Sequence, residues 1–298
     1  MSQPRRFSPR RELGGTGFRA SVLGIGDLAD ANVPFERSLG TLRRALDAGL
    51  NLLDTAPNYE DGLSEQLVGA ALRGVPRDSV FVIDKVDHFD RPVAPQIARS
   101  LQRLQLESAD LFVFHRVSTL AEYELLTQPG GRYAELQRCR DEGRCRFIGL
   151  SAHDPSVLER ALDDQIADVL MFPLGPFVDA RYVHRILPRS RELGVGSVCF
   201  KTFGAGKLLG DTSGYGAPLA EGLAELPHLS VQECLSYTLT WDPDVTLLGL
   251  STEAEQDAAF TAAEQFAPLN QPELVDIAER ARRAITGKGP CWWNPEPH

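Results

Sequence analysis

The sequence predicts an α/β fold: a single (β/α)8 TIM barrel over residues 1–298, with an N-terminal β-hairpin and an extra C-terminal helix. Short apolar runs alternate with helical stretches eight times along the chain, which is typical of a parallel sheet closed by helices. Polar side chains follow several of these runs where a strand should end. No G-x-G-x-x-G motif lies between the first strand and its helix, which disfavours an open dinucleotide-binding sheet.

Each element has a local reason. Two close glycine turns in residues 10–20 predict the hairpin, and the first barrel strand follows at 21–25. Residues 34–48 carry apolar side chains at every third or fourth position, and Gly49 ends that helix. The other strands are expected at 50–54, 79–84, 109–114, 146–150, 169–172, 196–200 and 245–248. The other helices are expected at 63–72, 94–105, 120–142 with a break at Pro129, from 154, and at 179–193, 231–240, 254–266 and 273–285.

Composition narrows the class of protein. The chain has 298 residues, of which 43% are hydrophobic, so it can bury a large core. It contains no apolar run long enough for a membrane span, and its first residues do not read as a secretory signal. A net charge of −10 argues against a broad nucleic-acid surface. Five cysteines without C-x-x-C spacing predict reduced thiols and no metal site in a cytoplasmic protein. We expect a monomer, because a barrel of this type needs no partner to close its core.

A candidate site begins in the stretch from Leu50 to Tyr59. Asp54 ends a buried strand and Tyr59 lies just beyond it, while Lys85 and His115 end the next two strands. Taken singly, these side chains have structural interpretations: a turn cap, a surface phenol, a lysine reaching solvent and a core histidine. Strand ends converge on one mouth of a barrel, and their joint occurrence there favours a site.

These four residue types suit proton transfer to a carbonyl oxygen. A tyrosine has a pKa of about 10, too high for efficient transfer at neutral pH, and a neighbouring ammonium such as Lys85 lowers it. Asp54 supplies the counter-charge for Lys85. His115 can donate a hydrogen bond to a substrate oxygen and orient it. No Ser, Cys or Thr lies beside a base in this set, which disfavours a covalent nucleophile.

The chain resembles the aldo-keto reductases. The resemblance is carried by LGGTGFRASVLGIG, NLLDTAPNYEDGLSEQLVGAAL, VFVIDK, DLFVFH, GRCRFIGLS, FKTFGAGKLLG and LLGLSTEAEQ. It implies a (β/α)8 barrel that transfers hydride between a nicotinamide cofactor and an aldehyde, ketone or alcohol. It also implies that Asp54, Tyr59, Lys85 and His115 form the catalytic tetrad, with Tyr59 the general acid in reduction and the base in oxidation.

The resemblance places the nicotinamide against three positions. Ser151 and Met171 stand where the family holds the carboxamide, and Phe200 stands where an aromatic ring stacks on the nicotinamide. This chain departs from the family at two of the amide positions, because Ala152, followed by His153, replaces an asparagine and Met171 replaces a glutamine. For Phe200, a place in the core is the alternative interpretation.

Two further segments correspond to the phosphate-binding parts of the family. The loop Phe203 to Leu209 is expected to close over the pyrophosphate with its backbone amides, and Gly249 to Gln256 to bind the adenosine phosphate. An ordinary turn and a helix cap are the alternatives. The positions named for the cofactor are Gly204, Gly206, Leu208, Gly249, Ser251, Thr252 and Gln256. The family's usual cofactor implies NADP. NAD is the alternative, because Gln256 replaces an arginine, and Glu253 and Glu255 add negative charge nearby.

The substrate pocket is expected where strand-end loops and the C-terminal tail meet. The named candidates are Asp27, His88, Phe89, Phe172, Trp292 and Trp293. For the tryptophans, packing on the barrel is the alternative, and the segment 204–228 is either a lid or a loop. The function inferred is NAD(P)-dependent reduction of a small carbonyl compound, or oxidation of the alcohol. A lyase or isomerase using the same residues and a nucleotide-binding barrel without catalysis remain as alternatives.

Overall fold

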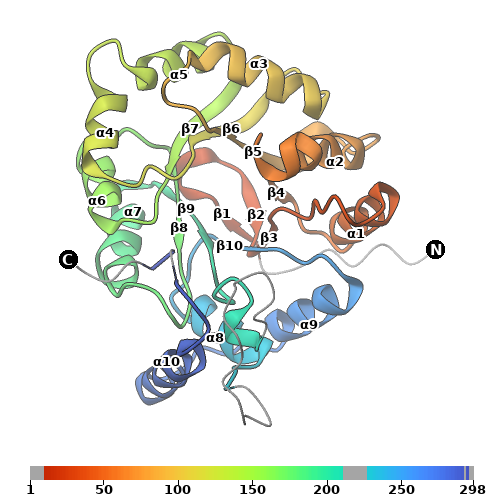
Figure 1. Cartoon of the computed structure of the whole chain (residues 1–298), viewed down its shortest axis with the longest axis vertical. Helices are drawn as coiled ribbons and strands as arrows, with labels where there is room; N and C mark the ends of the chain where they lie inside the picture. Colours follow the sequence, from red (N-terminus) through yellow and green to blue (C-terminus); the bar gives the residue numbers. More distant parts are fainter. Residues whose placement is uncertain (1–9, 211–226, 292, 295–298) are drawn as a thin grey trace.

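The computed structural model describes residues 10–210, 227–291, 293 and 294. Within them eight parallel strands close into a barrel in the order β10-β3-β4-β5-β6-β7-β8-β9, and helices surround it (Figure 1). The (β/α)8 prediction is therefore confirmed. The barrel strands are β3 (Leu23–Ile25), β4 (Leu52–Asp54), β5 (Phe81–Val86), β6 (Ala109–Phe114), β7 (Cys145–Ser151), β8 (Val169–Pro173), β9 (Gly196–Phe200) and β10 (Val245–Leu248).

The barrel interior is packed with apolar side chains. Phe81, Leu111, Val169 and Met171 are among the buried residues of one cluster inside the sheet. Two larger clusters lie between the strands and the helices, so most of the strands are covered on both faces. Because the middle of the barrel is filled, a ligand can reach the strands only at their ends.

The helices follow the strands and begin at recognisable caps. Thr119, Ser230, Thr252 and Asn270 each form a capping box with a glutamate three residues later. The break expected near Pro129 separates α4 from α5, where a Cβ on Gly131 would lie 2.5 Å from the Leu126 carbonyl oxygen. The helices are α1 (Phe35–Asp47), α2 (Leu63–Ala71), α3 (Val93–Leu104), α4 (Leu120–Thr127), α5 (Arg132–Asp141), α6 (Pro155–Asp163), α7 (Leu187–Leu193), α8 (Val231–Thr240), α9 (Glu253–Glu264) and α10 (Gln271–Ile285).

The N-terminal hairpin covers the amino end of the barrel. Strands β1 (Arg10–Glu12) and β2 (Arg19–Ser21) pair antiparallel, as the glycine turns predict. Their connection reaches the start of β9, where the Gly15 amide donates to the Gly194 carbonyl at 2.7 Å. Phe18 lies 5.2 Å from Phe81, ring to ring, and packs against the interior cluster. The open end is therefore the one where the strands finish.

Two buried lysines tie the segment after β9 to the C-terminal segment. Lys207 donates to the carbonyls of Lys288 and Pro290, and Lys288 donates to those of Lys207, at 2.7 Å, and Pro227, at 2.8 Å. The central part of the expected lid, residues 211–226, and Trp292 lie outside the described residues. No helix in the described part of the chain is both long and apolar enough to cross a membrane.

Candidate active site

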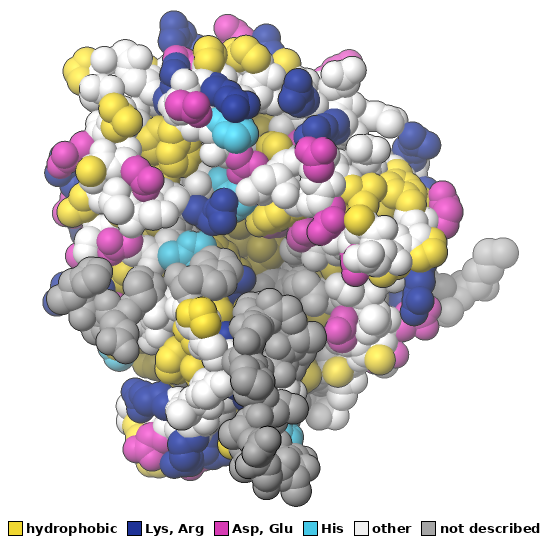
Figure 2. Space-filling view, in the orientation of Figure 1, with side chains coloured by type: hydrophobic (Ala, Val, Ile, Leu, Met, Phe, Trp, Pro, Cys, Tyr) yellow, Lys and Arg dark blue, Asp and Glu magenta, His cyan; other side chains and the backbone are white. Residues whose placement is uncertain are grey.

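A cavity of about 510 Å³ opens at the carboxyl ends of the strands. In Figure 2 a hollow near the centre of the face has an apolar floor and is bordered by basic, histidine and acidic side chains. All four expected catalytic residues line the cavity: Asp54, Tyr59, Lys85 and His115. The barrel thus brings together side chains that are up to 61 positions apart, from residue 54 to residue 115.

Asp54 and Lys85 form a buried ion pair at the base of the cavity. The Lys85 ammonium lies 2.7 Å from Asp54 Oδ1 and 2.6 Å from the Thr55 carbonyl oxygen, and the two side chains are only 2% and 3% exposed. Burial alone would lower the pKa of Lys85, but Asp54 and Tyr59 outweigh it and the pKa is raised. The expected counter-charge is present, and Lys85 stays cationic at neutral pH.

Tyr59 lies in the turn just after β4, with its ring above the lysine. The Lys85 ammonium is 4.5 Å from the ring centroid, and the next two residues, Glu60 and Asp61, both have left-handed backbones. Burial raises the pKa of Tyr59 to about 12, although Lys85 pulls it down. The expected net lowering is therefore wrong in this structure, because burial outweighs the ammonium. At neutral pH the phenol carries its proton and can donate it.

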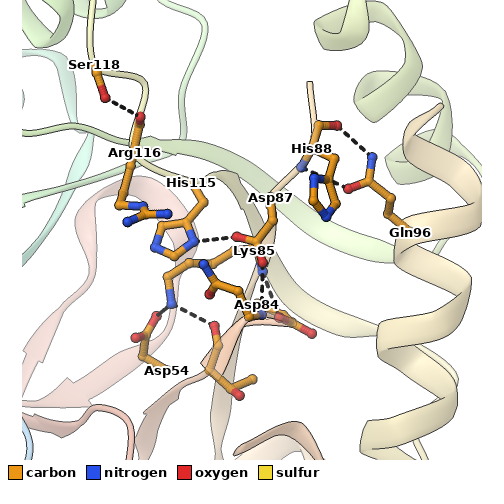
Figure 3. Close-up of polar contacts among 11 residues, drawn as sticks. Asp54, Asp84, Lys85, Asp87, His88, Gln96, His115, Arg116 and Ser118 are labelled. Carbon is orange, nitrogen blue, oxygen red and sulfur yellow. Dashed lines mark hydrogen bonds and ion pairs between the residues drawn. The ribbon is translucent and has the colours of Figure 1, made fainter. Parts of the chain in front are cut away.

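His115 is held by an acid that the sequence interpretation did not name. Its Nδ1 lies 2.5 Å from Asp87 Oδ1, and Asp87 Oδ2 accepts the Asn58 amide at 3.0 Å (Figure 3). Burial lowers the pKa of His115 to about 4, and the positive charges of Lys85 and Arg116 add to this against the opposing effect of Asp87. The ring is neutral at pH 7, and because the pKa of Asp87 is lowered by its contact with His115, its ionised carboxylate accepts from Nδ1 and favours the proton there. Donation from His115 to a substrate oxygen, as expected from the sequence, would require a second proton.

The positions expected to hold the nicotinamide lie on the opposite wall. Ser151, Met171 and Phe200 all line the cavity, as do Gly206 and Gly249. His153 lines it as well, and its ring centroid is 5.2 Å from that of Phe200. A flat aromatic ligand could therefore meet an aromatic face, a hydroxyl and an imidazole. Met171 offers only a thioether, a weak hydrogen-bond acceptor.

The expected phosphate cradle in residues 203–209 takes a different form. The amides of Gly204, Gly206 and Leu208 donate to carbonyls within the same turn, so they are not available to a pyrophosphate in this conformation. The Leu208 side chain is fully buried and packs near Trp293 in the cluster beside α10. Of the three positions named in this loop, only Gly206 lines the cavity.

The start of α9 does not line the cavity either. Thr252 caps this helix, and its own amide donates to the Glu255 carboxylate at 3.0 Å. Gln256 is fully buried, where it donates to the Thr41 carbonyl oxygen at 2.8 Å and accepts from Arg44 at 2.9 Å. Ser251 is exposed. The capping alternative for Thr252 is therefore what the structure shows.

The expected substrate positions separate into three places. Asp27 lines the cavity, and burial raises the pKa of its carboxyl group. His88 lines a separate cleft on the far side of Asp87. Phe172 is fully buried between strands and helices, with its ring stacked 5.8 Å from that of Tyr182. His88 and Phe172 therefore do not line the cavity. Phe172 points from β8 toward the helices, and His88 lies in the loop after β5, beside a different cleft.

The aromatic candidates beyond Phe172 also pack away from the cavity. Phe89 lies edge-on to Phe114, with ring centroids 5.8 Å apart. Trp293 is fully buried in the cluster of α10, with the Lys201 and Lys207 ammonium groups near its ring. For Trp293, packing is therefore the interpretation that the structure favours.

The structure adds two cations to the cavity wall. Arg116 follows His115, and Lys201 follows the end of β9. Both have left-handed backbones, at φ 56° and 69°, which is uncommon outside glycine and occurs often at functional sites. Burial lowers the pKa of Lys201 to about 8. The scarcity of lysine in the sequence and the strand-end position of Lys201 were signals that could have found it.

Comparison with known proteins identifies the family. The aldo/keto reductase family model matches residues 22–275. The chain belongs to the aldo/keto reductase family. As a member, it is an oxidoreductase of the NAD(P)H-dependent class, which confirms the resemblance found in the sequence.

Individual relatives are distant. The chain is 31% identical over 213 residues to "Probable aldo-keto reductase 1" of Glycine max, a match that covers 65% of this chain and 59% of that relative. It is 26% identical over 297 residues to the L-galactose dehydrogenase of Arabidopsis thaliana, covering 90% of this chain and 92% of that enzyme.

Solved structures share the fold of this aldo/keto reductase. A holo-form aldo-keto reductase from Bacillus halodurans superposes with a TM-score of 0.72 at 24% identity, covering 91% of this chain and 95% of that one. An aldo-keto reductase from Klebsiella pneumoniae in complex with NADPH gives a TM-score of 0.67 at 19% identity, covering 97% of each chain.

Proposed function

We propose that this aldo/keto reductase reduces a small aldehyde or ketone, or oxidises the corresponding alcohol, with Tyr59 as the acid or base. The observation that carries the proposal is the neutral, buried phenol of Tyr59 over the Lys85–Asp54 ion pair, inside a cavity with an aromatic wall. We also propose that residues 1–298 form one domain acting as a monomer, because all these side chains come from one chain.

The cavity fits a nicotinamide ring. Its volume of about 510 Å³ is within the range of small-molecule sites, and Phe200 supplies an aromatic face. The Ser151 side chain, 2% exposed, can bind the carboxamide. When bound, the nicotinamide nucleotide supplies the hydride that is added to the carbonyl carbon.

The residues of the chain supply the matching proton. Tyr59 donates its phenolic proton to the carbonyl oxygen while the carbon gains hydride, so that one alcohol forms and Tyr59 is left as phenolate. The Lys85 ammonium stabilises that phenolate, and Asp54 keeps the ammonium charged. In the reverse direction the phenolate takes the hydroxyl proton.

We propose NADP(H) as the dinucleotide, with NAD(H) as the alternative. The relative from Klebsiella pneumoniae binds NADPH, which supports NADP. In this chain the Thr252 amide is already taken by Glu255, Gln256 is buried, and the Arg44 cation beside it is already paired with Asp257 at 2.5 Å. This arrangement supports NAD(H) as the alternative.

Fluorescence titration with NADPH and NADH, side by side, tests the cofactor part. Micromolar binding of either supports the proposal, and binding of neither below the millimolar range opposes it. For catalysis, Tyr59→Phe keeps the ring and removes the proton. We expect cofactor binding to be retained and carbonyl reduction to fall by roughly 100- to 10,000-fold. Unchanged reduction by Tyr59→Phe would exclude Tyr59 as the acid.

A further inference from the structure

The contact between Asp87 and His115 restricts what the histidine can bind. Both side chains are 7% exposed, and Nδ1 lies 2.5 Å from the carboxylate oxygen. An ionised carboxylate only accepts hydrogen bonds, so the hydrogen between these atoms belongs to Nδ1. The second oxygen of Asp87 accepts the Asn58 amide at 3.0 Å, which fixes the carboxylate in this orientation.

The other ring nitrogen is then an acceptor. A neutral imidazole has one N–H and one lone pair, and with the proton on Nδ1 the lone pair is on Nε2. The charged groups near the ring are Asp87, Lys85 and Arg116, and Tyr59 lies edge-on at 5.7 Å between ring centroids. The two cations oppose a second proton on the ring. Among the described residues no hydrogen bond to Nε2 is formed, and His115 lines the cavity.

A simple ketone does not satisfy this arrangement. Its oxygen receives the hydrogen of Tyr59, and it has no hydrogen to offer Nε2. A buried acceptor left without a partner costs about 1–3 kcal/mol, a factor of roughly 5 to 150 in an equilibrium constant. A hydroxyl group on the carbon next to the carbonyl would supply the missing hydrogen while Tyr59 acts on the carbonyl oxygen.

We propose that Asp87 is a positioning residue that keeps the His115 proton on Nδ1, so that Nε2 selects substrates with a hydroxyl group beside the reacting carbonyl. The substrate class is therefore an α-hydroxy carbonyl compound, or a vicinal diol in the oxidative direction. This inference rests on the proposed function, since it assumes that Tyr59 serves the carbonyl oxygen.

Nitrogen-15 NMR of the wild-type protein tests the tautomer without any turnover. The chain has only six histidines, and the spectrum of His115→Gln identifies the signals of His115. At pH 7 we expect a protonated Nδ1 and an unprotonated Nε2. A proton on Nε2, alone or together with one on Nδ1, would overturn the inference whatever the enzyme reduces.

Matched substrates test the selectivity. We expect wild type to have a higher kcat/KM for hydroxyacetone than for acetone, and Asp87→Asn to reduce this ratio by ~5- to 100-fold, since an amide can donate to Nδ1 and free the other tautomer. Comparing ratios cancels the intrinsic reactivity of the two ketones. Asp90→Asn is the control, because it removes the same charge from an exposed side chain near Asp87 and should keep the wild-type ratio.

The outcomes separate the two proposals. Equal kcat/KM values for the two ketones in wild type, or an unchanged ratio in Asp87→Asn, would refute the selectivity. Failure of the proposed function appears differently, as turnover that Tyr59→Phe leaves unchanged. If Asp87→Asn does not fold, the wild-type tautomer decides.

Discussion

Replacing Asp54 by asparagine should destabilise the protein more than any comparable change on its surface. The Lys85 ammonium is 2.7 Å from Asp54 Oδ1 and 2.6 Å from the Thr55 carbonyl oxygen, and it also interacts with the Tyr59 hydroxyl. Asp54→Asn keeps the shape of the side chain but leaves a buried cation without its counter-charge. It therefore tests whether the pair is as tightly coupled as its geometry indicates.

The magnitude follows from the burial of both partners. Breaking a buried ion pair by removing one partner costs about 3–5 kcal/mol. The Thr55 carbonyl and the new amide oxygen still accept hydrogen bonds, so we expect the lower end, ~3 kcal/mol. For a chain of this size each kcal/mol lowers Tm by about 2 °C, so Tm should fall by ~6 °C.

The loss should also depend on pH. In wild type the pKa of folded Lys85 is raised above its unfolded value, so its stabilising effect is complete at neutral pH and disappears only at strongly alkaline pH. In Asp54→Asn we expect burial, which lowers the pKa of Lys85, to outweigh the remaining contact with Tyr59, so that the folded pKa falls below the unfolded one. The unfolded chain then holds the proton to higher pH, so the stability of the variant rises with pH. The gap to wild type should narrow between pH 7 and 10.

Urea denaturation at several pH values measures both effects. Asp90→Asn, an exposed change of the same charge, should be close to wild type. In the double variant Asp54→Asn/Lys85→Met, which has no buried cation, we expect stability to recover part of the loss while activity does not return. Additive losses in the double variant, or a gap that does not change with pH, would refute the coupling.

Two further predictions come from other buried groups. Burial lowers the pKa of His115 to about 4 and that of His153 to about 3. As the pH falls, the unfolded chain binds protons at these histidines before the folded protein does, so the free energy of unfolding, measured with urea, should be ~2 kcal/mol lower per histidine at pH 5 than at pH 7. Equal stability at the two pH values would contradict the neutral rings. Burial also lowers the pKa of Lys201 to about 8, so this cation on the cavity wall loses its charge between pH 7 and 9, and nucleotide affinity in a fluorescence titration should decline over that range. Lys201→Met should bind the nucleotide ~10-fold more weakly at pH 7 and show no such decline. A decline that persists in Lys201→Met would assign the titration to another group.

Much of the fold was predictable because its signals are local. Apolar spacing and glycine positions gave the order of strands and helices, and the barrel then placed Asp54, Tyr59, Lys85 and His115 on one cavity. Their convergence needed no side-chain detail, because parallel strands finish at the same end.

The features that the sequence did not predict depend on side-chain direction and burial. Phe172 precedes the end of β8, but its side chain points to the helices, so position along a strand did not place it on the cavity. The pKa of Tyr59 has two opposing causes, and only the structure shows that burial outweighs Lys85. Asp87 belongs to the loop after β5, and no spacing rule connects it with His115.

The reciprocal hydrogen bonds of Lys207 and Lys288 connect the cavity wall to the distant C-terminal segment. The ammonium groups of Lys207 and Lys288 each donate a hydrogen bond to a backbone carbonyl of the other segment. The turn that precedes Lys207 contributes Ala205 and Gly206 to the cavity. Cutting the chain after Gly287 would remove Lys288 together with the carbonyls of Lys288 and Pro290, which accept hydrogen bonds from the buried Lys207 ammonium. A short C-terminal truncation should therefore act on this enzyme as an active-site mutation acts, even though none of the described residues lost, 288–291, 293 and 294, lines the cavity.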